Sequence, residues 1–89
     1  VTAERQARLD ALGLLCPMPV IRTQNKVGEL EPGTVLEVLA TDPGALHDIR
    51  AWCRVHGHDY LDDRECRDTG CGETSQKHYH IRLRVTGRT

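Results

Sequence analysis

Residues 34–43, TVLEVLATDP, decide the fold that this chain can adopt. Their first seven residues are rich in β-branched and aliphatic side chains on both alternating faces. Such a run is typical of a strand that is covered on both sides, as a central strand of a sheet is. Asp42 and Pro43 then have the character of an N-cap and the first residue of a helix. A central strand followed at once by a helix predicts a mixed α and β architecture.

Two elements are expected before this stretch. Residues 8–12 alternate weakly and suit a short first strand. Residues 17–30 carry apolar side chains at approximately helical spacing, with charged residues between them. Pro32 and Gly33 end that helix.

Three elements are expected from Asp42 onward. The helix that it opens runs to Gly57, whose lack of a side chain suits a C-cap, and residues 59–65 suit a third strand. Residues 78–85 alternate most clearly between apolar and polar side chains. The order β-α-β-α-β-β predicts an α+β fold, a two-layer α/β sandwich with two helices packed on one face of a four-stranded mixed sheet.

Length and composition narrow the class of protein. The 89 residues suit a single domain spanning 1–89, with a core of about 8–86. A net charge of −1 and only three aromatic residues, Trp52, Tyr60 and Tyr79, give no field or stacking surface for nucleic acid. We therefore expect no direct nucleic-acid contact.

The expected compartment is the cytoplasm. No stretch approaches the roughly 18 apolar residues of a membrane span, and residues 1–10 lack the apolar core of a signal peptide. Thiols are kept reduced in the cytosol, so the four cysteines favour reactive or metal-binding roles over structural disulfides.

Cys16 is the main candidate for chemistry, within LGLLCPMPV at residues 12–20. If a helix begins at Pro17, Cys16 is its N-cap, and the amides of Met18 and Val20 are candidate donors to the sulfur. The positive end of the helix dipole then lowers the pKa of the thiol moderately. Pro17 and Pro19 stiffen the backbone that presents it. Because no acid–base partner lies nearby in sequence, a group carrier is favoured over a stand-alone enzyme.

A second set of ligand-type residues lies near the C-terminus: Cys66, Cys71, His78 and His80. Four such side chains suit zinc, but C-x4-C is at the wide edge of ligand spacing and the two histidines share one face of a predicted strand. A reversible disulfide and an ordinary exposed loop are the other readings of the two cysteines. The alternative function is therefore a redox- or zinc-responsive regulatory or interaction module. Asp42 and Asp48 are expected to be structural, as a helix cap and an exposed or turn-stabilising residue.

The chain resembles the TusA/SirA-like family of sulfur carrier proteins over residues 8–61, and the closing strand extends the resemblance to about Val85. The matching elements are Gly13 to Pro19 (GLLCPMP, with the family's Cys-Pro-x-Pro motif), Pro32-Gly33, Asp42-Pro43, Asp48-Ile49, Trp52-Cys53 and Gly57-His58. In this order and spacing they are far more specific than a lone Cys-Pro-x-Pro.

The resemblance implies that Cys16 carries sulfane sulfur as a persulfide, framed by Pro17 and Pro19, without a cofactor. It implies a sulfur-donating sulfurtransferase (a rhodanese, a DsrE-like protein or a cysteine desulfurase) and a sulfur-accepting protein as partners. The routes served by the family are tRNA thiolation, molybdenum cofactor biosynthesis and cytoplasmic sulfur oxidation. Met18 stands where carriers of the tRNA-thiolation type place an acidic residue. It is expected to face the partner protein. The resemblance therefore makes a role in sulfur oxidation at least as suitable as one in tRNA thiolation.

Overall fold

The computed structural model describes residues 5–67 and 77–86, and it contains the predicted order of elements. The elements are β1 (Gln6–Ala11), α1 (Met18–Val27), β2 (Val35–Ala40), α2 (Gly44–His56), β3 (Asp59–Cys66) and β4 (His78–Arg84). The predicted β-α-β-α-β-β order is confirmed, with boundaries that differ by at most three residues.

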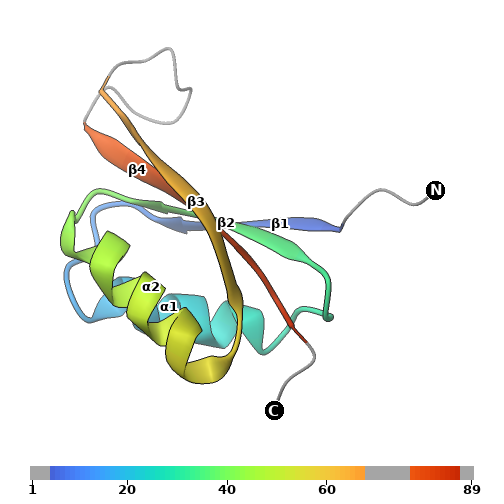
Figure 1. Ribbon diagram of the computed structural model, residues 1–89. Coiled ribbons are helices and arrows are strands. Elements are labelled where there is room, and N and C mark those ends of the chain that lie inside the picture. Colours follow the sequence, from blue (N-terminus) through green and yellow to red (C-terminus); the bar gives the residue numbers. More distant parts are fainter. Residues whose placement is uncertain (1–4, 68–76, 87–89) are drawn as a thin grey trace.

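The four strands form one mixed sheet in the order β1-β2-β4-β3. β1 and β2 are parallel, whereas β4 is antiparallel to both β2 and β3. Both helices cover the same face of this sheet (Figure 1). The two-layer sandwich and the interior position of β2 are therefore as the sequence predicted.

The core lies between the helices and the sheet. Alternate residues of β2 and β4 point toward the helices, where α2 adds Ala45, Ile49 and Cys53. Burial raises the pKa of the Cys53 thiol to about 11, as expected for a packed, unreactive cysteine. In the part of the chain that is described, neither helix is long and apolar enough to cross a membrane.

A β-bulge in β3 decides which of its side chains face away from the helices. The register with β4 shifts between Tyr60 and Asp62. After the shift, Cys66 pairs with His78 and Arg64 pairs with His80. Because the extra residue inverts the side-chain alternation, these polar residues share the sheet face that the helices leave open.

Replacing Ile49 tests the packing of α2 on the sheet. Its side chain has no exposed surface, so Ile49→Ala should lower the free energy of unfolding by about 2–5 kcal/mol and Ile49→Val by about 0.5–1.5 kcal/mol. Urea unfolding followed by circular dichroism measures both. Ile21 of α1 is 43% exposed, so Ile21→Ala serves as the control and should cost less than Ile49→Ala. Equal losses at the two positions would contradict this packing.

Candidate functional site

The turn that carries Cys16 is attached to the turn that follows β2. Parallel strands end at the same edge of a sheet, so the β1–α1 and β2–α2 connections lie side by side. The N–H of Gly13 donates to Thr41 Oγ1 at 2.9 Å, and the N–H of Cys16 donates to Asp42 Oδ2 at 3.0 Å. Gly13 has φ 79°, a left-handed conformation that glycine adopts without strain. These bonds place Cys16 at the carboxyl end of the parallel strand pair.

Asp42 links this turn to α2. Its Oδ1 accepts the N–H of Gly44 at 3.0 Å while its Oδ2 accepts that of Cys16. The N-cap of α2 is Pro43 rather than Asp42, one residue later than predicted. The Asp42 carboxylate nevertheless satisfies the first amide of the helix, which is the task expected of it.

The start of α1 differs from the prediction. The N-cap is Pro17 and the helix begins at Met18, so Cys16 precedes the cap. The Met18 N–H donates to the carbonyl oxygen of Leu15 at 2.8 Å and is not directed at the sulfur. The Cys16–Pro17 peptide bond is cis. Pro17 is exposed, Met18 is half-buried and Pro19 is fully buried, so only Pro19 contributes to the core.

The Cys16 thiol is exposed, free and bonded to an aspartate. Its Sγ–H donates to Asp48 Oδ2 of α2 at 3.4 Å. This hydrogen bond raises the pKa of the Cys16 thiol, and the negative charges of Asp48 and Asp42 raise it further. The expected lowering of the pKa by the helix dipole is therefore wrong, because the hydrogen bond to Asp48 and the two carboxylate charges favour the protonated thiol. Asp48, expected from the sequence to be structural, is the hydrogen-bond partner of this thiol.

No cation among the described residues offsets these carboxylates at Cys16. Arg50 of α2 lies on the side of the helix that faces β3, where Nη2 is 3.4 Å from Asp63 Oδ2. Its guanidinium also lies 4.8 Å from the centre of the Tyr60 ring. Arg50 therefore joins α2 to β3 and does not activate the thiol.

An open groove of about 380 Å³ lies between α1 and α2 beside the thiol. Pro17 and Asp48 line its end near Cys16, and Trp52 and Val55 line the rest with their neighbours on α2. Leu15 and Val55 are 72% and 77% exposed, which is unusual for large apolar side chains. An exposed apolar surface next to a reactive group is typical of a protein-docking site.

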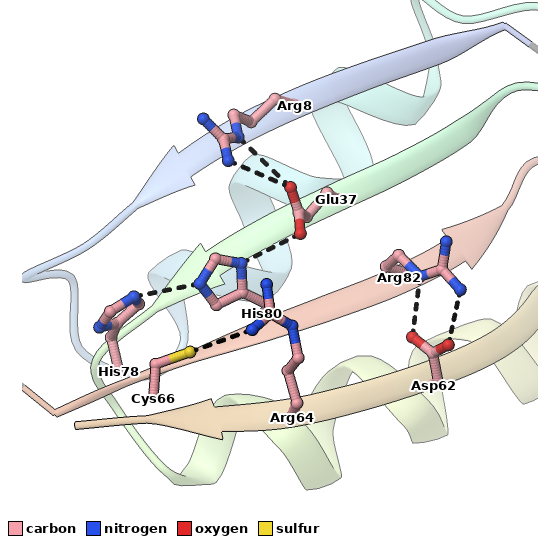
Figure 2. A network of polar contacts seen from close by, with 8 residues as sticks. All are labelled: Arg8, Glu37, Asp62, Arg64, Cys66, His78, His80 and Arg82. Carbon is pink, nitrogen blue, oxygen red and sulfur yellow. Dashed lines mark hydrogen bonds and ion pairs between the residues drawn. The ribbon is translucent and has the colours of Figure 1, made fainter. Parts of the chain in front are cut away.

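The second set of predicted residues lies on the opposite sheet face. Cys66, His78 and His80 come together there, and Figure 2 shows them within a polar network that spans the four strands. His80 Nδ1 lies 3.0 Å from Glu37 Oε2, and Arg8 binds the other oxygen of that carboxylate at 3.3 Å. Cys66 is disulfide-bonded. Cys71, the fourth predicted member, lies outside the described residues.

Sequence reasoning named Cys16 but missed its partnership with Asp48. The available signal was the position of Asp42 just before α2 and of Asp48 in the second turn of that helix. Only the side-by-side position of the two strand–helix turns brings that end of α2 to the thiol. The aspartates consequently act on Cys16 from more than 25 residues away in sequence.

Comparisons with known proteins agree on one family. The model of the family described as Sulfurtransferase TusA matches residues 7–85. The putative sulfur carrier protein YrkI of Bacillus subtilis is 53% identical over 57 residues, which cover 64% of this chain and 76% of that protein. The sulfur carrier protein TusA of Pseudomonas aeruginosa is 45% identical over 65 residues, covering 73% of this chain and 82% of that protein.

A solved structure has the same fold. The SirA-like protein of Desulfitobacterium hafniense superposes with a TM-score of 0.65 at 22% identity, covering 90% of this chain and 97% of that one. The family match extends from β1 through β4 and includes the Cys-Pro-Met-Pro segment at the helix start. The resemblance inferred from the sequence is thus confirmed, and the chain belongs to the TusA family.

Proposed function

We propose that this protein is a sulfur carrier that accepts sulfane sulfur as a persulfide on Cys16 and delivers it to an acceptor protein. The observation that carries the proposal is the exposed, free Cys16 thiol held at a strand–helix turn beside an apolar groove. Curated relatives named sulfur carrier proteins support the same role. Pro17 and Pro19, which follow Cys16 in the motif, are proposed to frame its sulfur, and Met18 between them is proposed to face the partner.

The transfer is a sulfur exchange without net oxidation. The Cys16 thiol loses its proton to water, and the resulting thiolate attacks the outer sulfur of the donor's persulfide. A new S–S bond forms on Cys16 while the donor's S–S bond breaks, and the donor leaves as a thiolate that takes a proton from water. Because Asp48 and Asp42 favour the protonated thiol, the free carrier is protected from adventitious exchange.

The donor and acceptor are proposed to be proteins that dock over the groove. Leu15, next to Cys16 in the chain, and Val55, in the groove, offer exposed apolar contact area, which suits a macromolecular partner better than a small substrate. The donor would be a rhodanese, a DsrE-like protein or a cysteine desulfurase, and the relay would operate in the cytoplasm. The apolar Met18 favours sulfur oxidation over tRNA thiolation, because an acceptor that recognises an acidic residue finds none between these prolines.

Mass spectrometry after incubation with a sulfane-sulfur donor tests the carrier role. The wild type should gain one sulfur atom on the peptide that contains Cys16, and a dithiol should remove it. Cys16→Ser should gain none. Cys53 provides an internal control, since its 1% exposure should keep it unmodified. A sulfur gain that persists in Cys16→Ser, or none in the wild type, would falsify the proposal.

Asp48→Asn tests the control of the thiol by the carboxylate. Loss of the accepting carboxylate should lower the pKa of Cys16, so the rate of alkylation by iodoacetamide should rise at lower pH than in the wild type. Each tenfold gain in thiolate should increase the rate only about threefold, because a less basic thiolate is a weaker nucleophile. Glu29→Gln removes an exposed carboxylate beyond the other end of α1 and should leave the pH profile unchanged. An unaltered profile for Asp48→Asn would contradict this role.

Val55→Glu tests docking separately from chemistry. Burial of a valine side chain contributes about 1.5–3 kcal/mol, so its loss should slow sulfur transfer from a persulfide-loaded rhodanese about tenfold or more. Loading by inorganic polysulfide should remain at the wild-type rate, because a small donor needs no groove. Asn25→Asp adds the same charge to the exposed side of α1 and serves as the control. Equal slowing with both donors would argue against a docking role.

A further inference from the structure

Three ligand-type side chains are buried together on the sheet face that lies opposite the helices. Cys66 ends β3, and His78 and His80 begin β4, with exposed fractions of 4%, 0% and 2%. Their sulfur and nitrogen ligand atoms all lie within 4.8 Å of one another. They do not take part in the proposed sulfur transfer, because Cys16 lies on the helical side of the sheet.

We propose that Cys66, His78 and His80 form a zinc site when Cys66 is reduced. The Nε2 atoms of the two histidines are 3.1 Å apart. Two nitrogens bound to one tetrahedral zinc at about 2.0–2.1 Å lie about 3.3 Å apart, so the imidazoles already have almost the required spacing. A zinc-bound sulfur and nitrogen lie about 3.6 Å apart, so the widest separation in the cluster has to close by about 1 Å.

The register of the sheet holds these ligands in place. His78 and His80 are two residues apart on one strand and therefore project from the same face. Cys66 is the direct cross-strand partner of His78. The spacing of two residues, which counted against a metal site in sequence reasoning, thus brings both imidazoles to one point.

A carboxylate orients one of the imidazoles, as is usual for zinc-bound histidine. Glu37 Oε2 lies 3.0 Å from His80 Nδ1, and Arg8 in turn binds Glu37 Oε1 (Figure 2). Nδ1 therefore carries the proton that it donates to Glu37, which leaves the Nε2 lone pair directed at the cluster. The sheet consequently supplies both the histidine ligand and the carboxylate that orients it, as zinc sites in proteins usually have.

Nitrogen and thiolate ligands in this combination favour zinc over magnesium or calcium, which prefer oxygen. Three protein ligands leave one position of the tetrahedron for water or an incoming group. Cys71, the fourth ligand predicted from the sequence, lies outside the described residues, and the site does not require it.

Zinc binding and the disulfide of Cys66 exclude each other, because zinc binds a thiolate. A dithiol gives two electrons and two protons to the disulfide and becomes a disulfide itself, releasing Cys66 as a thiol. Zinc then displaces the thiol proton, which passes to water, and the S–Zn bond forms. Arg64 Nη1 lies 3.3 Å from Cys66 Sγ and donates a hydrogen bond to that sulfur. The site therefore binds zinc only in the reduced protein.

Zinc titration of the intact chain in competition with a chromophoric chelator tests the site. The protein is reduced with a phosphine, because dithiols themselves chelate zinc. We expect one zinc per chain in the reduced protein and none at this site after oxidation. Cys66→Ser should weaken binding by more than the roughly 10- to 100-fold that loss of an outer partner costs, and Glu37→Gln should fall within that range.

Two control variants separate this site from other thiols and imidazoles. Cys16→Ser and His47→Asn, both at exposed positions outside the cluster, should keep the wild-type zinc affinity. Cobalt substitution in the wild type should give a sulfur-to-cobalt charge-transfer band. Cys66→Ser should abolish this band and Cys16→Ser should retain it, so the readout requires no variant of the buried histidines. Absence of zinc from the reduced wild type, or unchanged affinity in Cys66→Ser, would overturn the proposal. Since Cys16→Ser removes sulfur loading and not zinc, failure of one proposal leaves the other intact.

Discussion

The parallel pairing of β1 with β2 is the constraint on which the rest of the structure depends. Two parallel strands cannot be joined by a tight turn, so the chain has to cross the sheet through α1 before β2 begins. Both strands then end at the same edge, and their following turns meet. The Cys16 N–H joins the two turns by donating to Asp42 Oδ2 at 3.0 Å. The position of the Cys16 sulfur therefore follows from the parallel direction of β1 and β2.

This arrangement gives Cys16 an electrostatic setting that differs from that of an activated catalytic thiol. Helix N-termini usually favour a thiolate, but the carboxylates of Asp42 and Asp48 oppose that effect and keep the sulfur protonated. A carrier has to hold its cargo between two partners without reacting with other thiols. A protonated resting thiol meets that requirement of the proposed carrier, whereas a permanently ionised thiol does not.

Two separate groups of polar side chains, each with one cysteine, lie on opposite sides of the sheet. The helical face positions Cys16, and the open face buries Cys66 with His78 and His80. The bulge after Tyr60 makes the second set possible, because without the inserted residue Cys66 would point toward the helices. Glu37 of the central strand then joins the histidines to β1 through Arg8. Through Glu37, β2 thus also links the polar side chains on the sheet face that the helices leave open.

The sequence by itself determined the order of elements, the two-layer sandwich and the central strand, and it predicted Cys16 as the reactive thiol. Those features follow from local patterns: side-chain alternation, helical spacing, and proline and glycine at the ends of elements. Only the tertiary structure decided that Asp48 bonds to Cys16, that the pKa of the thiol is raised, and that His78 and His80 are buried beside Cys66. These features depend on contacts between residues distant in sequence and on one bulge, and local patterns do not encode the register that creates them.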